Sequence, residues 1–239
     1  MTVEIFPSAG DFQDSIMSDL SFKTGLQNGS NVAIIKNLLT TAETLRCVRL
    51  HQALAIEGDQ GWASVRRGCR DNYREIKHNP LSKVDQFCSR SIFFEWNSCI
   101  KKITDAVSKI TGIKGILEGD GFVEKNDHFF QAAISCYPVG GGMMAPHIDP
   151  LDTFFGLHVI VNLSTRGDDF IEGGLKVKSN ESDDFIDIEK YWCSGDAIVF
   201  NASAVLHSVE PIDAAEPSLG FLRGRYSLSV TMNRFQDIN

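Results

Sequence analysis

The sequence has few of the features that place a protein in a membrane, outside the cell or on nucleic acid. None of its apolar runs approaches the roughly 20 residues that a membrane-spanning helix needs. The N-terminus MTVEIFPSAGDFQDSIM has no basic segment followed by an apolar one, so we expect no secretory signal. Basic residues are also scarce, because 23 Lys and Arg stand against 31 Asp and Glu, for a formal charge of −8. This acidic balance argues against nucleic acid or an anionic membrane as a partner.

Cysteine pairs are missing too, since the six cysteines are scattered and none forms a C-x-x-C motif. In a chain of 239 residues this favours reduced, buried thiols over a disulfide framework or a zinc site, and we expect a cytoplasmic protein. With 43% hydrophobic residues the chain can bury a substantial core. No internal repeat or low-complexity linker divides it, and we expect residues 1–239 to form one domain.

Two consecutive regions of the chain differ in the spacing of their apolar residues. Residues 1–125 are predicted to be mostly helical with a few strands, one of them a short buried strand over 31–37. Helical spacing of apolar residues predicts helices over 10–26, 38–54 and 91–115. Thr40 and Glu43 form a capping-box pattern at the start of the second of these.

Residues 126–239 are instead built from short β segments bounded by Gly, Pro, Asp, Asn and Ser. Seven or eight strands with turn signals between them predict a sandwich or barrel, here a jelly roll. The fold class is therefore mainly β with a helical N-terminal part, whose helices buttress one sheet. The predicted strands cover 129–139, 157–164, 173–179, 184–189, 196–200, 206–212 and 225–233.

The stretch CYPVGGGMMAPHIDP, residues 136–150, invites two interpretations. Its glycines resemble a phosphate-binding loop, but no GK[ST] or following helix supports that, and a flexible approach between strands is favoured. His147 and Asp149 form an H-x-D pair, which alone is weak evidence for a metal. A third candidate ligand, His207, lies sixty residues on, after the strand-like GDAIVF. Two imidazoles and one carboxylate leave positions open for Fe(II) to bind a co-substrate and O2.

The last predicted strand supplies an independent signal. Alternation along RGRYSLSVTMN puts Arg225 and Ser227 on one face, with Tyr226 and Leu228 on the other. In a closed jelly roll covered by helices, the polar face turns into the lumen. An arginine with a hydroxyl two residues on can clamp a carboxylate. Arg223 is near enough in sequence to compete for that role.

Across about residues 129–235 the chain resembles the Fe(II)/2-oxoglutarate-dependent oxygenases. The resemblance implies a double-stranded β-helix, a cupin-like jelly roll, in which His147, Asp149 and His207 hold iron. It also implies that Arg225 and Ser227 bind the distal carboxylate of 2-oxoglutarate. The motifs that carry it are H-I-D (147–149), E-G-G-L (172–175), G-D-A-I-V-F (195–200), L-H-S-V-E-P (206–211) and R-Y-S (225–227).

The segment SCYP resembles an N-x-Y-P strand of some members, whose tyrosine contacts the same carboxylate. Tyr137 fits that role, although Ser135 stands where those members have asparagine. Residues 1–125 show no convincing resemblance, and substrate-selecting elements often lie there in this superfamily.

The resemblance implies a dioxygenase that uses Fe(II), 2-oxoglutarate and O2 to oxidise an unactivated C–H bond. The acid at Asp149 favours hydroxylation over halogenation, because related halogenases have a small residue there. The short, acidic chain without an appended recognition domain leads us to expect a small-molecule substrate, such as an amino acid or a natural-product intermediate. Many prolyl-hydroxylase-like members have lysine where this chain has Arg225, which argues against a prolyl hydroxylase. The alternatives are a protein-residue hydroxylase of the same fold and a catalytically silent jelly-roll binding protein.

Two further groups of residues each allow two interpretations. His158 and Asn162 alternate on one predicted strand and either line the lumen or pack on the outside. The arginines of RRGCRDNYR either cap an anionic substrate or form a solvated, ion-paired helix face. These arginines are Arg66, Arg67, Arg70 and Arg74.

Overall fold

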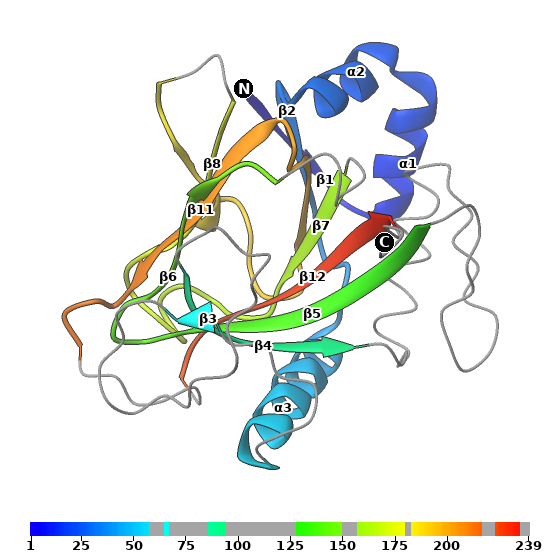
Figure 1. Cartoon of the computed structure of the whole chain (residues 1–239). Helices are drawn as coiled ribbons and strands as arrows, with labels where there is room; N and C mark the ends of the chain where they lie inside the picture. Colours follow the sequence, from blue (N-terminus) through cyan, green and yellow to red (C-terminus); the bar gives the residue numbers. More distant parts are fainter. Residues whose placement is uncertain are drawn as a thin grey trace, which may run out of the picture.

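The computed structural model describes residues 1–57, 65–66, 86–93, 128–149, 157–179, 183–216 and 223–234. Its N-terminal part combines helices with strands (Figure 1). Within the described residues no helix is both long enough and apolar enough to cross a membrane. The elements of this part are β1 (Thr2–Phe6), α1 (Ala9–Ser18), α2 (Leu20–Asn28), β2 (Asn31–Ile35), α3 (Thr41–Glu57), β3 (Val65–Arg66) and β4 (Gln86–Phe93).

The C-terminal part is almost entirely β, and its strands fold over one another as a jelly roll requires (Figure 1). The sheet order is β1-β2-β10-β7-β12-β5-β4-β6-β11-β8-β9, with β3 paired to β4. The elements are β5 (His128–Pro138), β6 (Gly142–His147), β7 (Leu157–Asn162), β8 (Gly174–Ser179), β9 (Ile186–Asp187), the 3-10 turn η1 (Ile188–Lys190), β10 (Ala197–Asn201), β11 (Val205–Ile212) and β12 (Gly224–Arg234).

Strand β4 joins the two halves of this folded sheet. Its residues 89–93 pair with β5, while Gln86 and Phe87 pair with Met144 and Met143 of β6. The prediction of a helix over 91–115 is wrong at its start, because Ser91–Phe93 continue β4. Apolar and aromatic residues in that segment suit a strand as well as a helix, and cross-strand pairing with β5 selects the strand. Residues 94–115 lie outside the described residues.

The helices cover one outer face of the sheet, as the sequence predicts. Helices α1 and α2 lie against β1, β2 and β10, while α3 lies against β4 and β5 (Figure 1). The predicted helix over 10–26 is two helices, because Asp19 ends α1 in an extended conformation and caps α2 by accepting from the Phe22 N–H at 3.0 Å. The capping box at the start of α3 is confirmed, with the Thr40 N–H donating to the Glu43 carboxylate at 2.7 Å.

Side chains alternate between the two faces of the sheet and so contribute to two separate hydrophobic cores. In β2, Ala33 and Ile35 pack outward against the helices, while Val32 and Ile34 pack inward. In β12, Tyr226, Leu228 and Val230 join the outer core under the helices. The neighbours Arg225 and Ser227 are therefore turned to the inside, where they are buried.

The glycine-rich stretch is a tight connection between β5 and β6. Gly140 and Gly141 adopt positive φ angles of 91° and 105°, which glycine adopts without steric cost. Their N–H groups donate to the Ile212 carbonyl at 3.1 and 2.8 Å. These donors are therefore occupied within the fold, which agrees with the preference for a turn over a phosphate cradle.

The capping box provides a test of the N-terminal elements. Thr40→Ala removes the side-chain acceptor for the Glu43 N–H and is expected to lower the free energy of unfolding by about 1 kcal/mol. Thr41→Ala, at the exposed first residue of α3, is the matched control and is expected to have little effect. Urea denaturation at pH 7 measures both, and equal losses would contradict the capping role.

Candidate functional site

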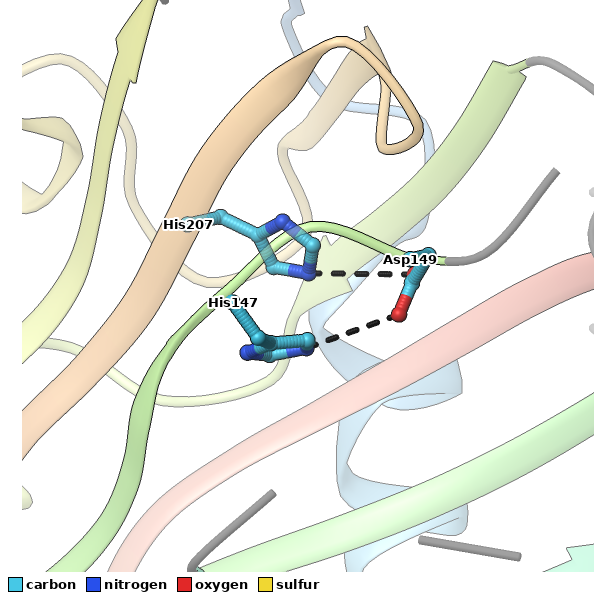
Figure 2. A group of neighbouring side chains, drawn as sticks. All are labelled: His147, Asp149 and His207. Carbon is cyan, nitrogen blue, oxygen red and sulfur yellow. Dashed lines mark ion pairs between the residues drawn. The ribbon is translucent and has the colours of Figure 1, made fainter. Parts of the chain in front are cut away.

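Three of the predicted residues meet at one end of the jelly roll. His147 ends β6, Asp149 follows two residues later, and His207 lies on β11 directly opposite His147 in the strand register. One potential ligand atom from each lies within 4.8 Å of the other two (Figure 2). Asp149 Oδ1 is 3.5 Å from His147 Nε2, and its Oδ2 is 3.8 Å from His207 Nε2. The Asp149 N–H donates to the Ala202 carbonyl at 3.0 Å, which anchors the residue beyond the strand.

Backbone carbonyls orient both histidine rings in the same way. His147 Nδ1 lies 2.8 Å from the Ala145 carbonyl and His207 Nδ1 lies 3.0 Å from the Val205 carbonyl. Because a carbonyl only accepts hydrogen bonds, Nδ1 carries the proton in each ring. Each neutral ring then presents the Nε2 lone pair to the Asp149 carboxylate. A cation bound between them would satisfy both lone pairs and the carboxylate, and outer hydrogen bonds of this kind orient metal-binding histidines.

Burial keeps these imidazoles neutral. It lowers the pKa of both His147 and His207 from 6.5 to about 4, and it raises the pKa of Asp149. Metal ions bind histidine in its neutral form, so protons do not compete for these two rings near pH 7. The donor set fits a divalent transition metal with open coordination positions.

A third histidine lies beside this group. His158 on β7 places Nε2 3.3 Å from Asp149 Oδ2, and burial lowers its pKa to about 3. The sequence allowed His158 to line the lumen or to pack on the outside, and the structure places it in the lumen. Asn162, on the same strand, is 1% exposed, pairs in register with Ser227, and leaves its Nδ2 without a partner among the described residues.

Arg225 lies deeper in the lumen and already has a charged partner. Its Nε donates to Glu189 Oε1 at 2.7 Å, and both side chains are 1% exposed. The Glu189 carboxylate also accepts from the Leu175 N–H at 2.9 Å and from the Trp192 indole at 2.8 Å. Three donors therefore hold this carboxylate. Arg225 Nη2 is buried without a partner among the described residues, which leaves a donor for a ligand.

Glu189 was not predicted as a site residue. The sequence pattern predicts a strand over 184–189, whereas the strand ends at Asp187 and the 3-10 turn η1 carries Glu189 into the core. Gly174, at φ +119°, leaves space for this carboxylate, since a Cβ there would overlap the Glu189 side chain. No local pattern marks this glutamate among the other acids, because its burial depends on an arginine 36 residues away.

The other predicted residues line the same lumen. Tyr137 lies opposite Arg225 in the strand register, with the Arg225 guanidinium 5.8 Å from its ring centre. Ser227 is buried and lies opposite Ser135. Arg223 is exposed and stands outside this group. Of the arginine run, Arg66 lies in β3, while Arg67, Arg70 and Arg74 lie outside the described residues.

No protein-family model and no curated protein sequence matches this chain. Its fold is similar to that of two solved structures, both of prolyl hydroxylases. One is a prolyl hydroxylase from Trichoplax adhaerens in complex with a peptide fragment of the hypoxia inducible factor oxygen degradation domain. It is 16% identical, has a TM-score of 0.57, and is matched over 93% of this chain and 91% of that one. The other is a Pseudomonas putida prolyl-4-hydroxylase, 13% identical, with a TM-score of 0.57, matched over 95% of this chain and 100% of that one.

These neighbours confirm the jelly-roll fold class and correct the expected partner. The prediction of a small-molecule partner is wrong, because the Trichoplax neighbour is a hydroxylase bound to a peptide. Both neighbours are prolyl hydroxylases, the class that the sequence argument from Arg225 disfavours.

The buried pair predicts a large stability effect. Glu189→Ala leaves the Arg225 guanidinium buried without its counter-charge, and is expected to lower the free energy of unfolding by about 3–5 kcal/mol. Glu210→Gln is the matched control, because the Glu210–Lys176 pair is 45% and 27% exposed and such pairs contribute about 0–1 kcal/mol. Urea denaturation compares the two, and similar small losses would contradict the buried pair.

The lowered histidine pKa values predict how the stability of metal-free protein depends on pH. Unfolded histidines bind protons below about pH 6.5, whereas His51, His147, His158 and His207 stay neutral in the folded state down to about 3–4. The unfolded state then binds more protons, so the free energy of unfolding falls as the pH drops from 6.5 towards 4.

His51 isolates one such contribution, since it is buried away from His147, Asp149 and His207 (the candidate metal-ligand group), and its Nε2 lies 3.1 Å from Ser89 Oγ. His51→Gln is expected to reduce the slope of the unfolding free energy between pH 6 and 4.5 by up to about 1.4 kcal/mol per pH unit. Urea denaturation at a series of pH values, with EDTA present, measures the slope. An unchanged slope would show that His51 is not held neutral.

Proposed function

We propose that this chain is an Fe(II)/2-oxoglutarate-dependent dioxygenase that hydroxylates a residue of a protein or peptide. The observation that carries the proposal is the convergence of His147, Asp149 and His207, with both Nδ1 atoms committed to backbone carbonyls, in the lumen of a jelly roll. A silent remnant has no physical reason to keep both rings aimed at one carboxylate while their burial holds them neutral.

The chain's own residues would bind the metal and orient the co-substrate. His147 and His207 would supply neutral Nε2 ligands and Asp149 one carboxylate oxygen. Arg225, with its unpaired Nη2, would receive the distal carboxylate of 2-oxoglutarate, and Ser227 and Tyr137 lie in register beside it. When bound there, Fe(II) together with 2-oxoglutarate and O2 supplies the oxidising power for inserting oxygen into a C–H bond.

Glu189 and Trp192 would hold the clamp in place before the co-substrate arrives. The Glu189 carboxylate fixes Arg225 through Nε, and the guanidinium lies 5.5 Å from the Trp192 ring centre. A guanidinium held through Nε keeps its other nitrogens for a ligand carboxylate. Because the residue is oriented beforehand, less conformational entropy is lost when the ligand binds.

The inner core would exclude water from the reacting atoms. Phe200 packs its ring 5.2 Å from that of His207 and 6.0 Å from that of His158. Exclusion of water strengthens the electrostatic interactions inside the site.

The peptide-type substrate is supported by the fold neighbours, one of which holds a peptide and both of which are prolyl hydroxylases. Proline-containing peptides are accordingly the first substrates to test. The substrate sequence is left to the experiment.

Anaerobic addition of Fe(II) and 2-oxoglutarate to the metal-free protein tests the proposal. A weak visible charge-transfer band is expected, and succinate formation with one added oxygen atom on a peptide is expected on exposure to air. Asp149→Asn is expected to lose the band and at least about 100-fold in turnover, since it removes a metal ligand. Asp168→Asn, on an exposed turn, is the matched control and keeps both. A binding protein without activity would show neither the band nor succinate.

A further inference from the structure

A second arginine enters the lumen between the metal-ligand group and Arg225. Arg90 lies on β4 opposite Ser135, and Ser135 lies opposite Ser227 on the other side of β5. Residues directly opposite one another in adjacent strands share a face of the sheet. Arg90 therefore shares the inward face of Ser135 and Ser227, and its Nε donates to the buried Ser135 hydroxyl at 3.0 Å.

Arg90 lies on the side of Tyr137 that faces His147, Asp149 and His207. The Arg90 guanidinium interacts with the Tyr137 hydroxyl, while Arg225 lies over the ring of the same tyrosine. Burial raises the pKa of Asp149, and the nearby positive charge of Arg90 opposes that rise. Tyr137 thus separates two guanidinium groups, of which Arg90 is the one near the metal-ligand group.

The two arginines differ in how their charge is balanced. Arg225 forms its buried ion pair with Glu189 at 2.7 Å. Among the residues that the structure describes, none of the ion pairs involves Arg90. Arg90 is therefore a partly buried cation whose Nε is held by a neutral serine, which leaves its charge for an anion in the lumen.

We propose that Arg90, held by Ser135, is a positioning residue that binds the metal-side carboxylate of a 2-oxo acid, so that the co-substrate is gripped at both ends, by Arg90 and by Arg225. The inference rests on the proposed function. It assigns the two carboxylates of one ligand to two different arginines. The Arg225–Glu189 pair is neutral overall. Arg90 and the metal would therefore supply the positive charge that balances a dianion in the lumen.

Two ligands that differ at one end separate the roles of the arginines. 2-Oxoglutarate has both carboxylates, and 2-oxopentanoate replaces the distal one with a methyl group. Arg90→Met is expected to weaken binding of both ligands by the same factor, about 10- to 100-fold, because both keep the metal-side carboxylate. Arg225→Met is expected to weaken only 2-oxoglutarate and to abolish the preference for it. Anaerobic titration of the Fe(II)-loaded unmodified protein and of the two variants, followed by the visible band, gives the six dissociation constants.

Three controls separate positioning from damage to the fold. Arg90→Lys keeps the charge and is expected to recover part of the lost affinity for both ligands. Arg223→Met, at an exposed arginine, is expected to bind both ligands as the unmodified protein does. Binding of Mn(II) alone, measured by electron paramagnetic resonance, is expected not to weaken in Arg90→Met, because the change removes a positive charge near the ligands.

The outcomes that overturn the inference are distinct from those that overturn the proposed function. If Arg90→Met binds both 2-oxo acids normally, or loses only the preference for 2-oxoglutarate, Arg90 does not hold the metal-side carboxylate. Weaker Mn(II) binding in this variant would show structural damage and would also remove the assignment. If the unmodified protein shows no band with either 2-oxo acid, the proposed dioxygenase function itself fails.

Discussion

The packing of β12 under the helices is the constraint on which the site depends. Tyr226, Leu228 and Val230 enter the outer core and can be buried only on that face. Because side chains alternate along a strand, this burial forces Arg225 and Ser227 into the lumen. A shift of one residue in register would exchange the two sets, exposing the apolar residues to the lumen and burying an arginine among the helices. The hydrophobic core therefore sets the inward position of Arg225 and Ser227.

A buried arginine needs a counter-charge, and the Glu189 carboxylate on the turn η1 supplies it to Arg225. The Trp192 indole and the Leu175 N–H donate to the same carboxylate. Buried ion pairs of this kind add little net stability, but they are costly to break. The lumen thus contains His147, Asp149 and His207 together with Arg90, Tyr137 and the Arg225–Glu189 pair.

Sequence patterns predicted the parts of this protein that depend on local or periodic interactions. Alternation on the last strand predicted the inward face of Arg225, and the capping box predicted the start of α3. The ordered motifs brought His147, Asp149 and His207 into one hypothesis, and the structure brings these residues together. The strand β4 and its Arg90 were missed, because residues 91–93 were assigned to a helix and the strand is defined by its pairing with β5 and β6. The substrate class was predicted wrongly, because length and charge carry no information about the surface that receives a substrate.

Residue type and strand period are local properties, so the amino-acid sequence alone identifies the donor groups and the strand faces on which they lie. Which charges meet depends on how the chain folds. The tertiary structure placed Glu189 against Arg225 across 36 residues, His158 beside Asp149, and Arg90 beside Ser135 across 45 residues. Such pairs depend on strand register and on the folding of one sheet over itself, and these follow from the sum of many packing contacts. Burial and charge compensation arise only in the closed lumen, which is formed by segments that lie far apart in the sequence.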